Sequence, residues 1–372
     1  MIRLSKSCLT DIEKNAVKKV LDAEFLGMGK EVFEFEETLS DFFGRGVACV
    51  SSGTAALHLA LQAAQVTYGD EVLVPSMTYV ASFQAISAVG AIPVACDISI
   101  ETLQLDLNDA RERITENTKA IMPVYYGGGA HGRQNIFEFS NEHNLNLVED
   151  AAHAFGSYEN GVLVGSDFGV TCFSFDGIKN ITCGEGGCVV SSDTALLDRV
   201  RTARLLGVEN DTARRRESDR SWFPDVTVQG WRYHMNNVSA AIGMAQFNRF
   251  DDLRKKRQSL AKHYDSGLRE ISSLATLKSD YDYVVPHVYP IRMIGCDFRN
   301  ELRKRLHELK IETGIHYFPN HLLSKYQNPF ALPLPVTERV FPELLTLPLH
   351  PDLEVSDLDY IIDALKRVFK HG

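Results

Sequence analysis

The chain has 372 residues, which suffices for roughly two to three domains and a large buried core, and its composition is ordinary for a globular protein. Its 39 Lys and Arg residues against 49 Asp and Glu residues give a formal net charge of −10, which disfavours general binding to nucleic acid or to anionic membranes. The seven cysteines show no paired metal-ligand spacing, so we expect reduced thiols, no metal site and a cytoplasmic protein.

The N-terminal segment contains no apolar run typical of a signal peptide, and its spacing predicts an amphipathic helix that begins near Thr10 or Asp11. Residues 72–96 carry no charge and are numerous enough to span a bilayer. The prolines, glycine and polar residues in this segment instead favour a buried strand (VLVP), a short helix (SFQAISAV) and a second strand (PVAC). We therefore expect no membrane span.

Apolar runs that are mostly separated by helical patterns continue along the chain, at residues 47–50, 120–126, 145–150, 170–175 and 188–192. This alternation predicts an α/β fold with a mostly parallel sheet sandwiched by helices, and ligands at the loops beyond the carboxyl ends of the strands. We assign residues 1–250 to this large domain. A charged helix, the run YVVPHVYPIRM, a helix around residues 298–310 and a terminal helix from about Ser356 then predict a smaller C-terminal domain over residues 251–372.

The segment SSGTAALHLALQAA, residues 51–64, places Ser-Gly-Thr between a strand and a strongly helical run. Backbone N–H groups and the hydroxyl of Thr54 would then lie at a helix N-terminus, which suits an anion such as phosphate. Ser and Thr also favour this position as ordinary helix caps, and on this segment alone the cap is the better interpretation.

Two further residues are candidates for a chemical role. Asp150 ends the apolar run LNLVED, with His153 just after it; the alternative is an aspartate that caps a helix. Lys179 lies in the apolar, glycine-flanked stretch CFSFDGIKNITCGEGGCVV, where burial favours the neutral amine that can form an imine. Its alternative is a buried stem with an ammonium group that reaches water. A phosphate cradle, an acid for a ring nitrogen and a Schiff-base lysine together are what pyridoxal 5′-phosphate requires.

Seven motifs give these residues a context: SSGTAALHLAL, PSMTYVAS, VEDAAHAFG, FSFDGIKNITCGEGG, YHMNNVSAAIGMAQF, GIHYFPNHL and LPLHP. In this order and spacing they resemble the DegT family of sugar aminotransferases, which are fold type I pyridoxal-phosphate enzymes, from about residue 5 to residue 370. The resemblance implies a large cofactor-binding α/β domain with an N-terminal helix, and a smaller C-terminal α+β domain. It also implies a homodimer, with pyridoxamine 5′-phosphate as the form of the cofactor that carries the amino group.

Matched position by position, the resemblance implies that Lys179 is the Schiff-base lysine and proton shuttle, and that Asp150 keeps the pyridine nitrogen protonated. It places His153 near the 3-hydroxyl of the ring and stacks Tyr79 on the ring. The remaining residues that it assigns to the cofactor are Gly53, Thr54 and Ser174 at the phosphate, and Arg232 from the partner subunit.

The expected substrate-binding residues are His316 and Tyr317, in the motif GIHYFPNHL, and Arg214, Arg215 and Arg216. The three arginines belong to the run ARRRESDR, residues 213–220, which suits a diphosphate; the alternative is a solvated surface.

Two departures from the family pattern stand out. Arg232 in GWRYHM replaces the common asparagine, so the phosphate contact is either kept by a stronger donor or redirected to substrate. Asp176 and Gly177 lie where the family often has histidine or another bulky residue, and we assign Asp176 no role.

The competing hypotheses come from other classes. The run GGGAHG, residues 127–132, fits the nicotinamide-binding pattern GxGxxG, with Glu149 and Asp150 about twenty residues on, but it explains neither Lys179 nor the SSGT segment. A catalytically silent cofactor-binding scaffold is a second alternative. Some family members are keto-sugar dehydratases with histidine at the lysine position, which Lys179 argues against. For the substrate, we expect a nucleotide-linked deoxy-keto-sugar with glutamate as amino donor, or alternatively a keto-cyclitol.

Overall fold

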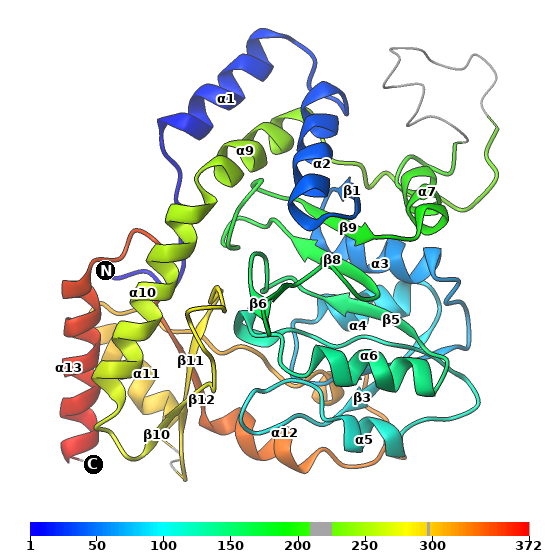
Figure 1. The fold of residues 1–372 in the computed structure, drawn as a ribbon. Coiled ribbons are helices and arrows are strands. Elements are labelled where there is room, and N and C mark those ends of the chain that lie inside the picture. The colour runs from blue at the N-terminus through cyan, green and yellow to red at the C-terminus, as the bar shows by residue number, and fades with distance from the viewer. Residues whose placement is uncertain (209–224, 296–297, 372) are drawn as a thin grey trace.

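The computed structural model describes residues 1–208, 225–295 and 298–371 (Figure 1). The large sheet has seven strands in the order β1-β9-β8-β5-β4-β2-β3. Their bounds are β1 Gly46–Val50, β2 Glu71–Pro75, β3 Ile92–Cys96, β4 Thr118–Ile121, β5 Asn146–Asp150, β8 Val170–Ser174 and β9 Gly187–Ser191. The pairs from β8 to β3 are parallel, while β9 is antiparallel to both β1 and β8, so β9 alone runs against the other six.

Helices cover both faces of this sheet, because successive strand residues point to opposite sides. In β1, Ala48 and Val50 pack into one apolar core, whereas Val47 and Cys49 pack into the other. The first core contains α3 (Gly53–Ala63), α4 (Ala81–Ala88) and α7 (Thr194–Ala203); the opposite face is covered by α2 (Lys30–Phe43), α5 (Leu107–Glu112) and α6 (Arg133–Glu142). The predicted α/β fold is therefore confirmed.

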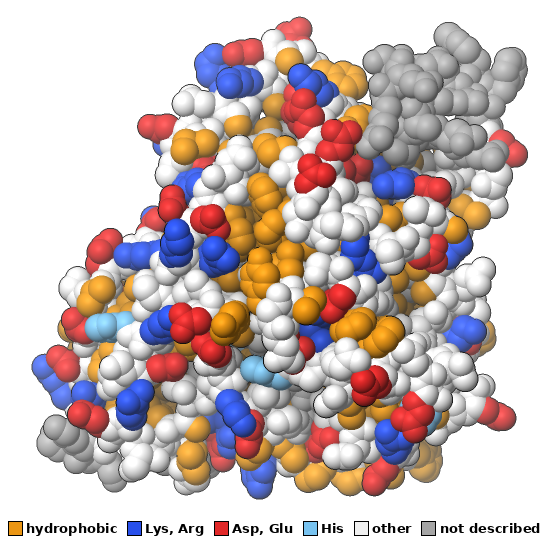
Figure 2. All heavy atoms as spheres, viewed as in Figure 1, with side chains coloured by type: hydrophobic (Ala, Val, Ile, Leu, Met, Phe, Trp, Pro, Cys, Tyr) orange, Lys and Arg blue, Asp and Glu red, His pale blue; other side chains and the backbone are white. Residues whose placement is uncertain are grey.

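The apolar segment 72–96 forms β2, α4 and β3, as its prolines and glycine predicted. Within the described residues, no helix has the length and apolar character needed to cross a bilayer. Lys and Arg side chains are interspersed with Asp and Glu over the described part of the face in Figure 2, where no continuous basic area is seen. The predicted N-terminal helix is also present, as α1 (Asp11–Asp22), and Thr10 caps it.

A second, antiparallel sheet follows, in the order β10-β11-β12. Its strands and the remaining strands and α-helices are β6 Tyr158–Glu159, β7 Val162–Leu163, α9 Asn237–Asn248, α10 Phe250–Leu268, β10 Leu274–Thr276, β11 Tyr289–Met293, α11 Arg299–Glu308, α12 Pro335–Val340, β12 Leu344–Leu347 and α13 Val355–His371. Helices α10 and α13 lie side by side on this sheet (Figure 1). The start of α10 packs into the large core through Phe250 and Leu253, and its later turns pack into a separate core from Leu260 onward. One helix thus joins both cores, and the boundary after residue 250 stays a prediction.

Candidate active site

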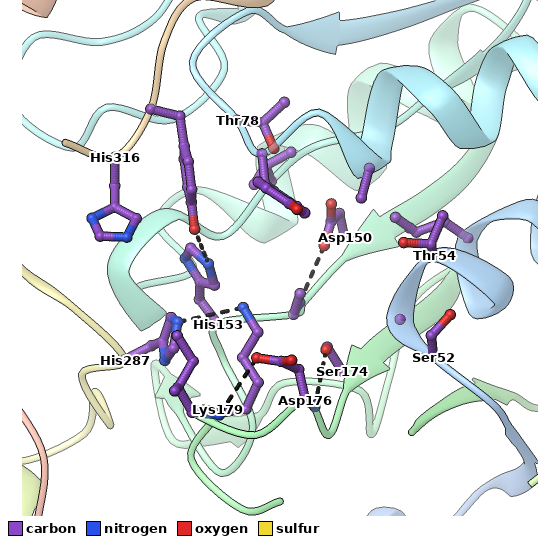
Figure 3. A pocket seen from close by; sticks show the side chains of 18 of the residues that line it. Ser52, Thr54, Thr78, Asp150, His153, Ser174, Asp176, Lys179, His287 and His316 are labelled. Carbon is purple, nitrogen blue, oxygen red and sulfur yellow. Dashed lines mark hydrogen bonds between the residues drawn. The ribbon is translucent and has the colours of Figure 1, made fainter. Parts of the chain in front are cut away.

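A cavity of about 410 Å³ lies beyond the carboxyl ends of the parallel strands, where the alternation predicted ligand binding (Figure 3). Loops that follow β1, β2, β4, β5 and β8 line it, together with two segments from the C-terminal part of the chain. The lining residues that matter chemically are Ser52, Gly53, Thr54, Thr78, Tyr79, Asp150, His153, Ser174, Asp176, Lys179, Glu185, His287, His316 and Tyr317. Every predicted single-chain cofactor residue is among them.

The N-terminus of α3 forms one end of the cavity. Ser52 caps this helix by accepting a hydrogen bond from the Ala55 N–H at 3.1 Å, so the ordinary cap interpretation holds for Ser52, while Thr54 lines the cavity. A Cβ atom at Gly53 would lie 2.7 Å from the Cβ of Ser174. Because position 53 has no room for a side chain, the backbone at this helix start stays accessible, as an anion site requires.

Asp150 ends β5 and points into the cavity. Turns follow it, so it does not cap a helix. Its Oδ2 accepts a hydrogen bond from Ser82 Oγ at 2.7 Å, and its Oδ1 accepts one from the Ala152 N–H at 3.2 Å. Burial raises the pKa of Asp150, while these hydrogen bonds and the charge of Lys179 act in the opposite direction. The carboxylate is thus fixed in position and would be stabilised by a bound cation.

Lys179 directs its amine into the same cavity, with Nζ 3.4 Å from Nε2 of His287 (Figure 3). Burial lowers the pKa of Lys179 to about 8, although Asp150 and Asp176 act in the opposite direction. More of this amine is neutral near pH 7 than in an ordinary lysine, and imine formation with an aldehyde needs the neutral form.

His153 lies beside the lysine in a fixed tautomer. Its Nδ1 accepts the Gly127 N–H at 3.3 Å, so the proton of the neutral ring is on Nε2, which faces the Tyr317 hydroxyl at 2.9 Å. Burial holds the pKa of His153 well below its usual range. The Tyr79 ring lies 5.7 Å from that of Tyr317 and is 59% exposed, so Tyr79 presents a free aromatic surface to the cavity. Its stacking on a cofactor ring stays a prediction.

Two histidines from the C-terminal part complete the cavity. His316, a predicted residue, has Nδ1 2.9 Å from Thr346 Oγ1, and burial lowers its pKa to about 4. His287 was not predicted: it lies in YVVPHVYPIRM, where a single histidine within an apolar run was the available signal. Neither histidine carries a charge at neutral pH, because burial also lowers the pKa of His287 well below its usual range.

The remaining predicted site residues are not among the described residues that line this cavity. Arg232 is exposed and pairs with Leu205 in an isolated bridge, outside the lining of this chain's cavity. Arg214, Arg215 and Arg216 lie outside the described residues.

The glycine run of residues 127–132 serves packing. A Cβ at Gly128 would meet the carbonyl oxygen of Val285 at 2.4 Å. At the start of α6, the carboxylate of Glu159 accepts the N–H groups of Gly132 and Arg133. An acidic side chain therefore already holds the position that the pyrophosphate of a dinucleotide would need.

The residues present fit pyridoxal 5′-phosphate on three independent observations. Gly53 leaves the backbone at the start of α3 without a side chain, at a position where a Cβ atom would collide with Ser174. Asp150 is a buried carboxylate at the cavity wall, and Lys179 carries an amine with a lowered pKa. Within the described parts of the chain, no group of three or more His, Cys, Asp or Glu side chains could hold a metal ion.

Comparisons with known proteins cover almost the whole chain and agree with a pyridoxal-phosphate site. Residues 7–366 match the model of the DegT/DnrJ/EryC1/StrS aminotransferase family. The chain is 32% identical to the uncharacterised protein MJ1066 of Methanocaldococcus jannaschii, covering 98% of this chain and 96% of that protein. Its fold is similar to that of TlmJ, an aminotransferase of Streptoalloteichus hindustanus (TM-score 0.91, 32% identity, 99% and 98% coverage). It is also similar to Spr1654 of Streptococcus pneumoniae, named as a sugar aminotransferase and solved in PMP and PLP forms; for the PMP form, the TM-score is 0.92 at 30% identity, with 100% and 98% coverage.

Proposed function

Because the chain belongs to the DegT/DnrJ/EryC1/StrS aminotransferase family, we propose that it moves an amino group from glutamate to a nucleotide-linked deoxy-keto-sugar. The family membership makes the chain a pyridoxal-phosphate-dependent sugar aminotransferase. The proposal also includes the pathway and the compartment: the reaction belongs to amino-sugar synthesis for surface polysaccharides or antibiotics, and the enzyme works in the cytoplasm.

One observation carries the proposal: the cavity brings Lys179, Asp150 and the N-terminus of α3 together at the carboxyl ends of parallel strands. When bound, pyridoxal phosphate supplies an aldehyde that takes up an amino group and a ring that withdraws electrons. Lys179 would hold the cofactor through its Nζ and, when released, move a proton at the substrate carbon. Asp150 would hold the proton on the ring nitrogen, and α3 would bind the phosphate.

The proposal also names the residues that would bind the substrate. His316 and Tyr317 line the cavity and would contact the sugar; in Figure 3, His316 lies on the side opposite Thr54. The arginines of residues 213–220 suit a diphosphate and support a nucleotide-linked substrate. Arg232 lies outside the cavity of its own chain, which agrees with a role in the partner's site of a homodimer.

The test is a product assay. The purified protein is incubated with pyridoxal phosphate, glutamate and a panel of nucleotide-linked keto sugars and keto-cyclitols, and the mixture is examined by mass spectrometry, with Lys179→Ala as the control. We expect an aminated nucleotide sugar together with 2-oxoglutarate from the parent protein only. Amination of a keto-cyclitol alone would overturn the substrate class, and a dehydrated, unaminated sugar would overturn the aminotransferase reaction.

A further inference from the structure

Lys179 has one side-chain partner at hydrogen-bond distance among the described residues, and this is His287, 3.4 Å away. The partner comes from 108 positions further along the chain, just before β11. The two groups meet because the segment before β11 packs against the loop after β8, where Asn180 also donates a hydrogen bond to the Val285 carbonyl.

The imidazole of His287 is enclosed and neutral. The residue is 4% exposed, its ring lies 4.4 Å from that of His153, and its Nδ1 has no hydrogen-bond partner within the described residues. Since the ring is uncharged at neutral pH, Nε2 can offer a lone pair to a protonated amine while Nδ1 keeps the ring proton.

Arg257 of α10 ties the two backbones together. Its Nη2 lies 3.3 and 3.4 Å from the carbonyl oxygens of Ile178 and Lys179, and its Nη1 lies 3.3 and 3.2 Å from those of Pro286 and His287. One buried guanidinium therefore donates to both segments and holds the lysine and the histidine in a constant relation. The backbones from which the two side chains extend are therefore held close to each other.

We propose that His287 is a positioning residue for Lys179: its Nε2 accepts a hydrogen bond from the protonated amine, aims that amine into the cavity and stabilises its charged form. The proposal rests on the assignment of Lys179 as the cofactor lysine. Its effect falls on the part of the reaction in which the lysine is not bonded to the cofactor and must hold or move a proton. Without His287, the buried amine would lose its one side-chain hydrogen-bond acceptor among the described residues and would release its proton at lower pH.

Other groups around the amine of Lys179 also affect its protonation. Asp150 and Asp176 favour the ammonium form, and the charge of Arg257 disfavours it. The other two titratable neighbours, His153 and His316, are neutral imidazoles, because burial lowers the pKa of both. His287 is the member of this set within hydrogen-bond distance, so its removal acts through the bond itself.

The test measures the protonation of Lys179 directly. The full-length protein, freed of cofactor with hydroxylamine, is labelled briefly with acetic anhydride across a pH series, and the peptide that contains Lys179 is quantified by mass spectrometry. The exposed Lys255 serves as the internal reference. In His287→Leu we expect the midpoint of labelling to fall by about one pH unit, a tenfold loss of proton affinity, which is the size of one hydrogen bond to a charged group. In His287→Gln, whose amide oxygen can replace Nε2, it should stay close to the parent value.

An unchanged or higher midpoint in His287→Leu would overturn the proposal, and so would a His287→Gln midpoint as low as that of the leucine variant. If His287→Leu does not fold, His287→Asn, whose amide is too short to reach the amine, takes its place with the same expected fall. The labelling needs neither cofactor nor substrate, so a failure of the proposed reaction leaves this result interpretable.

Discussion

Replacing Lys179 by methionine should stabilise the cofactor-free protein at neutral pH. The lysine is partly covered by the cavity wall, and burial lowers its pKa from the ordinary 10.5 to about 8. Such a shift means that folding disfavours the charged amine, so the residue costs stability that its function requires. Methionine fills a similar volume without a charge.

The size of this stability cost and the pH range in which it applies follow from the lowered pKa of Lys179. At about 1.4 kcal/mol per pKa unit, the lysine costs the native state up to about 3 to 4 kcal/mol below pH 8. Because the folded protein binds fewer protons than the unfolded chain between about pH 8 and pH 10.5, the cost shrinks as the pH rises through this range and disappears above it. Water that enters the cavity screens the amine, which makes the figure an upper bound.

Thermal unfolding of the cofactor-free parent and of Lys179→Met, at pH 7 and at pH 10.5, measures the effect. We expect the variant to melt a few degrees higher at pH 7 and nearly together with the parent at pH 10.5. Lys255→Met, at an exposed position, should show no comparable difference between the two pH values. A stabilisation of equal size at both pH values would reflect packing alone and would refute a desolvated amine.

Three further predictions concern the site. Asp150→Asn should still bind pyridoxal phosphate, because the side chain keeps its shape, but should lose at least tenfold in turnover with its best substrate; near-normal turnover would remove Asp150 from the catalytic residues. Mixing inactive Lys179→Ala chains with inactive Arg232→Ala chains should restore activity, because each heterodimer then has one intact site; no recovery despite proven exchange would place Arg232 in the site of its own chain. Calorimetric titration with millimolar NAD or NADP should show no binding, because Glu159 already occupies the helix start at residues 127–132, and saturation would revive the dehydrogenase hypothesis.

The sequence was sufficient for the parts of the site that local pattern determines. Asp150 ends a recognisable strand, Lys179 follows another, and the SSGT segment precedes a clear helix, so each position could be inferred by itself. Their meeting in one cavity follows from the rule that ligands bind at the carboxyl ends of parallel strands.

What the sequence could not show depends on contacts between distant segments. His287 reaches Lys179 from 108 positions away, and nothing in YVVPHVYPIRM indicates which side chain it meets. The run GGGAHG matched a dinucleotide motif because glycines serve close packing as well as phosphate binding, and the acid that fills its helix start, Glu159, comes from 27 positions beyond Gly132. The reversed direction of β9 was likewise invisible, because apolar patterning does not record strand direction.

Borohydride reduction of the holoenzyme, followed by peptide mapping, tests the central claim most directly. Reduction should fix the pyridoxal phosphate covalently on one lysine, and the labelled peptide should be the one that contains Lys179. The label should be absent from Lys179→Ala. A reduced adduct on another lysine, or an adduct of undiminished yield in Lys179→Ala, would contradict the assignment of this cavity as the site of amino transfer.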